Sequence, residues 1–258
     1  MINTLAESAY LLYPLAISAA VLAGFINTLA GSGSLITLPM LIFLGLPPGI
    51  ANGTNRIGIL IQSIVGVAGF RKSGKLEWRD GWPFVLPTTL GAVAGAFIAI
   101  GLDADRMNTA IAVVMAVMLV LTIAQPEKWL REETELAAGH RGVGNFLLFF
   151  VIGIHGGFIQ AGVGILMLMA MVLRCGFAVA NANAVKLVLV LILTVPAVAI
   201  FIVYDQVHWP LALLMATGQG AGAWIAAHFA SNSPNAALWT RRLLIAILIF
   251  SIIKLLSM

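Results

Sequence analysis

Long apolar runs separated by short polar stretches fill the whole chain. A helix needs about 20 apolar residues to cross a hydrocarbon core of about 30 Å. The runs that reach or approach this length are Tyr10–Leu29, Ala51–Phe70, Trp82–Leu102, Met107–Ala124, Gly142–Ile159, Asn183–Tyr204, Trp209–Phe229 and Leu243–Leu256. Two further apolar runs, Leu35–Leu46 and Ile165–Cys175, are short. Since the runs are continuous rather than alternating, they predict helices and not the strands of a membrane barrel.

Composition supports a membrane environment. Of the 258 residues, 61% are hydrophobic and 9% are charged, and the mean hydropathy is +1.04. A soluble domain carries about 25% charged residues. The sequence therefore predicts an all-α polytopic membrane protein. The formal net charge of +4 comes mostly from the loops, so it indicates topology rather than binding to nucleic acid.

The second half of the chain repeats the first at an offset of 131 residues. Ala30-Gly-Ser-Gly33 coincides with Ala161-Gly-Val-Gly164 at this offset. Further coincidences pair Gly45 with Gly176, Asn52 with Asn183, Trp78 with Trp209 and Gly91 with Gly222. Apolar matches are common in such a chain, whereas matching glycines, asparagines and tryptophans are not. We therefore predict two repeats of about five helical segments each, residues 1–124 and 142–258, joined by a polar cytoplasmic linker over residues 125–141.

Loop charge predicts that the two repeats have opposite orientations. The loop Arg71–Asp80 carries four basic residues, whereas its repeat mate around Tyr204–His208 carries none. Cytoplasmic loops of membrane proteins are enriched in Lys and Arg. With the first loop inside, ten of the fourteen basic residues lie inside, and both termini lie outside. This indicates an inverted repeat, and a re-entrant hairpin in place of either short segment would change the number of crossings.

Glycine-rich interruptions occur at matching places in the two halves. Gly31, Ser32, Gly33 and Ser34 precede the first short segment, and Gln160, Gly162 and Gly164 precede the second. Inverted repeats with interrupted helices are typical of transporters, whose sites lie near the membrane midplane. Each following helix would direct free N–H groups and a positive dipole end toward a ligand. The alternative is that these glycines only pack helices together.

Amides followed by one cation come after each short segment. The first half supplies Asn52, Asn55 and Arg56, and the second supplies Asn181, Asn183 and Lys186. A charge inside a membrane span is rare and indicates a functional site. The alternative is that these cations extend toward the membrane surface. Arg56 and Lys186 align only after a shift of one residue.

The predicted spans contain no Asp or Glu. Cation pathways commonly use carboxylates at membrane depth, whereas the polar groups here are mostly donors. This pattern favours an anion. His155 is a candidate for carrying a coupled proton. The chain has no Cys/His cluster with metal-ligand spacing and no ATP-binding motif, so we expect no metal, no cofactor and no enzymatic activity.

The order of these motifs resembles the TauE/SafE family of sulfite and organosulfonate exporters. The resemblance rests on the Gly-Ser-Gly site, the Asn-x-x-Asn-Arg segment, the Gly74-Lys-Leu-Glu-Trp78 loop and Asn181-x-Asn-x-x-Lys186, and it covers roughly residues 10–257. It implies export of sulfite or a related sulfonate across a bacterial inner membrane by a secondary transporter. An anion channel and, less favoured, an intramembrane enzyme are the alternatives.

Overall fold

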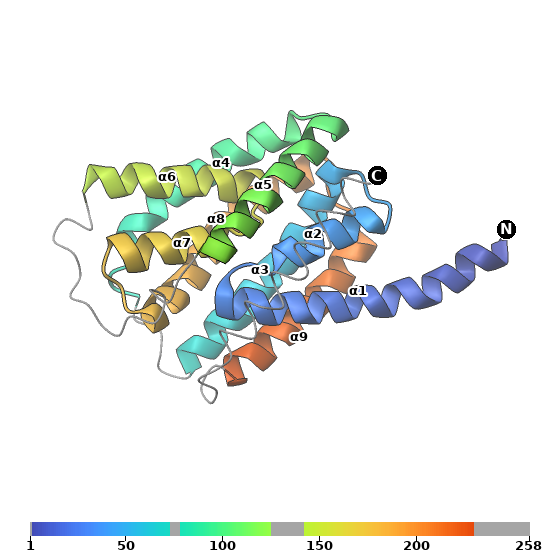
Figure 1. Ribbon diagram of the computed structural model, residues 1–258, viewed down its shortest axis with the longest axis horizontal. Helices are drawn as coiled ribbons and strands as arrows, with labels where there is room; N and C mark the ends of the chain where they lie inside the picture. The colour runs from blue at the N-terminus through green and yellow to red at the C-terminus, as the bar shows by residue number, and fades with distance from the viewer. Residues whose placement is uncertain (1, 73–77, 125–141, 230–258) are drawn as a thin grey trace.

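The computed structural model describes residues 2–72, 78–124 and 142–229, and within these ranges the chain forms helices and no strand (Figure 1). The first half contains α1 (Ile2–Ala30), α2 (Ser34–Phe43), α3 (Pro48–Lys72), the short 3-10 helix η1 (Trp82–Phe84), α4 (Val85–Ile100) and α5 (Ala104–Ala124). The second half contains α6 (Val143–Phe158), α7 (Val163–Met169), the π-helical turn η3 (Ala170–Arg174), α8 (Val179–Val203) and α9 (Trp209–Phe229). The linker 125–141 and the predicted span Leu243–Leu256 lie outside the described residues.

The described helices suit a lipid environment. Three of them are long and apolar enough to cross a membrane, over Trp82–Ile100, Ala104–Leu121 and Asn181–Val203. Their outward faces carry large apolar side chains, such as Val120 at 63% and Val203 at 76% exposure. The interior holds several fully buried polar side chains. Large apolar side chains exposed along helices that are long enough to cross a bilayer are typical of proteins embedded in lipid, so the chain is a helical membrane protein.

α1 and α9 pack side by side in the same direction. Gly218 lies against Ala20, and one turn later Gly222 lies against Phe25. Because the contacts advance together along both helices, the two helices are parallel. Their backbones approach closely since glycine has no Cβ to separate them.

α3 runs in the same direction as α9. Gly58 meets the amide of Gln219, and Gly69 meets Ala227 further along both helices. α1, α3 and α9 therefore form one set of helices with a common direction.

α8 runs in the opposite direction to α3. The Arg56 guanidinium lies over the Phe201 ring, whereas Gly66, later in α3, faces Leu187, earlier in α8.

α4 and α6 are parallel to each other. Gly91 lies against Phe150, and Gly95 lies against Phe158 further along both helices. The Phe84 ring, just before α4, contacts the Phe177 ring, just before α8. The Phe97 ring, within α4, contacts the Tyr204 ring, just after α8. α4 and α8 therefore run in the same direction. α4, α6 and α8 therefore form a second set, which runs opposite to the first.

Two pairs of glycines that the sequence offset aligns share a left-handed backbone conformation. Gly31 and Gly162 have φ values of 78° and 77°, and Gly45 and Gly176 have φ values of 92° and 78°. Only glycine adopts this left-handed region at little cost. The first pair ends the helical path before α2 and α7, and the second pair turns the chain toward α3 and α8. The two predicted short segments thus begin and end at equivalent glycine turns.

α1 ends inside the bundle rather than at its surface. A Cβ on Gly66 would lie 3.8 Å from Thr28 Cγ2, so the last turn of α1 is level with Gly66 of α3. α3 continues from there to Lys72, which is about 9 Å further along a helix. Along the common direction of α1 and α3, the first glycine break is therefore reached before the end of α3, and its neighbours are buried.

Candidate functional site

The two glycine breaks meet backbone to backbone. A Cβ on Gly31 would lie 2.5 Å from the Cα of Gly164 and 2.7 Å from its carbonyl carbon. Gly164 is equally close to Gly31, so a side chain on either residue would collide with the opposite backbone. The structure thus brings the predicted interruptions of both halves to one place.

Polar side chains hold the breaks in position. The Asn27 Oδ1 accepts a hydrogen bond from the Gly33 N–H at 3.2 Å. Ser34, the first residue of α2, donates its hydroxyl across the two halves to the Gln160 carbonyl at 3.3 Å. In the second break, Gln160 has a φ of 62°, and the His155 Nε2 lies 2.9 Å from the Ala161 carbonyl oxygen.

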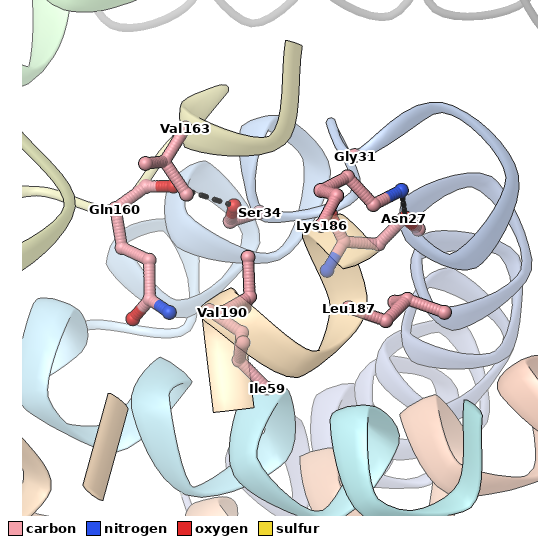
Figure 2. Close-up of a pocket in the computed structure, with 9 residues that line it drawn as sticks. All are labelled: Asn27, Gly31, Ser34, Ile59, Gln160, Val163, Lys186, Leu187 and Val190. Atoms are coloured by element: carbon pink, nitrogen blue, oxygen red, sulfur yellow. Dashed lines mark hydrogen bonds between the residues drawn. The ribbon is translucent and has the colours of Figure 1, made fainter. Parts of the chain in front are cut away.

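A small cavity lies beside this meeting point (Figure 2). The volume open to the centre of a water molecule is about 10 Å³, which is close to the requirement of one water. Its lining comes from both glycine breaks and from α1, α2, α3, α7 and α8. It comprises Asn27, Gly31, Ser34, Ile59, Gln160, Val163, Lys186, Leu187 and Val190. Residues from both halves therefore enclose one space.

Lys186 is the charged group of the cavity. It is 1% exposed. Its Nζ donates to the Asn27 carbonyl at 3.1 Å, to the Thr28 carbonyl at 3.3 Å and to the Asn183 Oδ1 at 2.5 Å. These two carbonyls belong to the last turns of α1, where the helix dipole places partial negative charge. Lys186 therefore binds the end of the interrupted helix of the other half.

Arg56 binds the end of α6 as Lys186 binds the end of α1. It is fully buried and donates to the Gly156 carbonyl at 3.0 Å, the Gly157 carbonyl at 2.5 Å and the Gln160 Oε1 at 3.1 Å. Its guanidinium also lies 4.5 Å from the centre of the Phe201 ring. Each cation thus binds the carboxyl end of the first helix in the opposite half.

An asparagine accompanies each cation. The Asn52 side chain donates to the Phe158 carbonyl at the end of α6, at 2.7 Å. Its repeat mate Asn183 donates to the Thr28 carbonyl near the end of α1, at 3.1 Å. We call these two sets of contacts the helix-end clamps: Asn52 and Arg56 on α6, and Asn183 and Lys186 on α1.

Neither clamp cation has a carboxylate partner within the described part of the chain. Their hydrogen-bond acceptors are backbone carbonyls and side-chain amides. The salt bridge between Arg106 and Asp103 lies on the exposed surface, away from both. A buried charge without a counterion is costly in a low-dielectric interior, and the partial charges of the helix ends compensate it only in part. Both buried cations therefore lack full charge compensation from the described residues.

The structure gathers only part of the predicted site around the cavity. Gly31, Ser34, Gln160 and Lys186 line it. Asn183 does not line the cavity but accepts a hydrogen bond from Lys186. Arg56 is connected to the cavity only by its hydrogen bond to Gln160. The Gln160 Nε2 donates to the Thr194 hydroxyl at 2.6 Å.

The other predicted residues lie outside the cavity lining. Asn55 accepts hydrogen bonds from Thr37 at 2.6 Å and Gln219 at 3.4 Å. The Ser32 hydroxyl and the Asn181 Oδ1 are buried without a hydrogen-bond partner among the described residues. Gly162 lies against Met118 of α5. Asn52, Gly33, Gly164 and His155 position the breaks through the contacts given above.

Asn27, Thr28 and Thr194 join the site without having been predicted. Asn27 and Thr28 interrupt the first apolar run just before its glycine break, and polar residues at membrane depth are unusual. That interruption was a signal in the sequence. Thr194 stands alone in an apolar run, and only its contact with Gln160 connects it to the site.

The chain resembles a known protein family and several named relatives. The family model for the sulfite exporter TauE/SafE matches residues 16–255. A probable membrane transporter protein, ORF9, from Sinorhizobium sp. is 26% identical over 212 residues, which cover 82% of this chain and 80% of the relative. One from Haemophilus influenzae is 24% identical over 201 residues, 78% of each chain. The probable membrane transporter protein YfcA of Escherichia coli strain K12 is 26% identical over 204 residues, 79% of this chain and 75% of YfcA.

No solved structure matches the chain significantly. The family match and these relatives indicate a membrane transporter rather than an enzyme. Since the match covers nearly the whole chain, this protein belongs to the sulfite exporter TauE/SafE family.

Proposed function

We propose that this protein is a secondary transporter that exports a small sulfur oxyanion, sulfite or a related sulfonate, across a bacterial inner membrane. The observation that carries the proposal is Lys186, a buried cation that lines the cavity between the two halves and has no carboxylate partner among the described residues. An oxyanion beside it would supply the missing negative charge. The match to the sulfite exporter family supports the choice of sulfur oxyanions.

The anion would meet donors from both halves. Lys186 supplies the charge, and the hydroxyl of Ser34 and the side-chain amide of Asn27 supply hydrogen-bonding groups from the first half. The ten-residue helix α2 begins at Ser34, so its positive dipole end faces the same space. Export is favoured by an inside-negative potential, by about 2.3 kcal/mol per charge for each 100 mV.

The helix directions support two repeats of opposite orientation. α1, α3 and α9 run one way, while α4, α6 and α8 run the other. At the offset of the repeat, α1 corresponds to α6, α3 to α8 and α4 to α9, so each of these six helices has its counterpart in the opposite set. The helix-end clamps are exchanged by the same relation. Inverted repeats around a central site are the usual basis of alternating access.

The size of the cavity favours a carrier over a channel. It has room for about one water, whereas sulfite has four heavy atoms. Binding would therefore require the two halves to move apart around the site. A channel would need a continuous path in its conducting state.

A thermal-shift screen of the purified protein tests the proposal. We expect sulfite to raise the melting temperature, because a ligand that binds only the folded state stabilises it by about 2.7 kcal/mol at one hundred times its dissociation constant. Sulfate, thiosulfate, sulfoacetate and taurine would define the preferred anion. Sulfite-loaded proteoliposomes would measure efflux in parallel. If none of these compounds stabilises the protein and none leaves the proteoliposomes, the proposed function is refuted.

A further inference from the structure

One face of α3 carries buried polar side chains along a path away from the cavity. Gln62 and Ser63 lie three and four residues after Ile59, and Gly66 and Phe70 lie three and seven residues after Ser63, so all five share a face. All five are buried. Ile59 lines the cavity (Figure 2), and the face leads from it toward the basic end of α3.

Gln62 and Ser63 have unused hydrogen-bonding groups on this face. Both residues are fully buried. Neither atom of the Gln62 amide nor the Ser63 hydroxyl has a hydrogen-bond partner among the described residues. Buried polar groups are nearly always satisfied, so such exceptions call for an explanation such as water or a ligand. These groups are suited to a state in which the face is open to water or to a passing ion.

The second half has no unpaired polar turn at the equivalent place. At the offset of the repeat, Leu193 and Thr194 of α8 stand where α3 has Gln62 and Ser63. Leu193 packs in the apolar core. Thr194 donates to the Val190 carbonyl and accepts from Gln160, so it is satisfied. The unpaired polar turn is therefore a property of one half only.

An apolar plug closes the route beyond this turn. Phe70, Ala184 and Leu187 form a buried cluster against which Val67 packs, and we call these four residues the apolar plug. Leu187 also lines the cavity and lies against Gly66. On the far side of the plug, α3 ends in two exposed cations, Arg71 and Lys72.

We infer that the Gln62–Ser63 face of α3 is the route by which the anion reaches the cavity from the basic end of α3, with the apolar plug as its closed gate. The basic residues would attract the anion, and the Gln62 amide and the Ser63 hydroxyl would replace part of its hydration shell during passage. This inference rests on the proposed function, because it gives a path to the site proposed above.

The test measures sulfite efflux and the thermal stabilisation by sulfite in the same variants. Gln62→Leu introduces the residue that α8 carries at the equivalent position, and Ser63→Ala removes only the hydroxyl. We expect each variant to slow sulfite efflux from proteoliposomes by about ten-fold or more. Their melting temperatures should stay equal to the parent's or rise, because removing an unpaired buried polar group does not lose a hydrogen bond. Sulfite should stabilise them as it stabilises the parent protein.

A matched control is Thr88→Val, which removes a buried hydroxyl on α4 that is bonded to the Phe84 carbonyl; its efflux should stay within about two-fold of the parent's. Unchanged efflux in both Gln62→Leu and Ser63→Ala would overturn the route. A fall in melting temperature that accounts for the lost efflux would assign Gln62 and Ser63 a structural role instead. Loss of sulfite stabilisation would make them part of the binding site. If sulfite fails to stabilise the parent protein, the proposed function itself fails.

Phe70→Ala tests the gate separately. Truncating this ring leaves space in the apolar plug, so we expect sulfite flux through the variant to rise and to lose saturation. The readout is the initial rate of flux against sulfite concentration in proteoliposomes. Rates equal to or below the parent's, in protein that still shows sulfite stabilisation, would show that the plug is not the gate.

Discussion

Replacing Lys186 by methionine is expected to abolish sulfite efflux and sulfite-dependent thermal stabilisation together. Methionine keeps most of the length of the lysine side chain and removes its charge. A hydrogen bond to a charged group contributes about 1.5–3 kcal/mol, so losing the attraction to the anion weakens binding at least ten-fold. Efflux from proteoliposomes and the melting temperature with and without sulfite are the measurements.

The behaviour of the ligand-free variant separates two roles of Lys186. Its contacts with the Asn27 and Thr28 carbonyls support the end of α1, whereas removing an uncompensated buried charge is favourable. If the only role of Lys186 were to support α1, the variant would have a lower melting temperature, and sulfite would still raise that temperature. Lys72→Met is the matched control, since Lys72 is an exposed lysine at the end of α3, and it should keep its sulfite stabilisation.

Gly31→Ala is expected to be strongly destabilising, by about 3 kcal/mol or more. The left-handed backbone costs alanine about 1–2 kcal/mol, and the new methyl group would lie 2.5 Å from the Cα of Gly164, where overpacking typically costs a further 1–3 kcal/mol or so. The melting temperature in detergent should fall by about 5–10 °C. Efflux should fall with it, because the two breaks can no longer touch.

Gly45→Ala is the matched control for this contact. Gly45 has a φ of 92°, but a Cβ there would meet nothing within 4 Å. Its loss of stability should reflect the backbone conformation alone, about 1–2 kcal/mol. Equal losses in Gly31→Ala and Gly45→Ala would show that the contact between the breaks contributes little.

The sequence predicted most of the helices and that they belong to a membrane protein, because a membrane-spanning helix needs a long apolar run that is visible in the sequence. Tyr10–Leu29, Ala51–Phe70 and Trp209–Phe229 lie within α1, α3 and α9. The Gly-x-Gly sites were predicted to interrupt the helices, and Gly31 and Gly162 adopt the left-handed conformation that glycine favours. The described helices α2 and α7 occupy the two short segments.

The partners of the polar residues could not be predicted in the same way. Arg56 and Lys186 stood out because charges are rare at membrane depth, but nothing in the sequence indicated that each binds the carbonyls at a helix end of the opposite half. A backbone carbonyl is present at every residue, so its role as a hydrogen-bond partner leaves no mark in the sequence. The separation of Arg56 from the cavity lining likewise depends on tertiary packing.

The two helix-end clamps differ in chemistry although they occupy equivalent places. Arg56 binds the end of α6 with a rigid, planar guanidinium whose face lies against an aromatic ring, while Lys186 binds the end of α1 with a single ammonium group on a flexible chain. An ammonium exchanges partners with less rearrangement than a guanidinium does. In the proposed transport cycle, the two half-cycles should therefore have unequal barriers, with the lysine side opening faster than the arginine side.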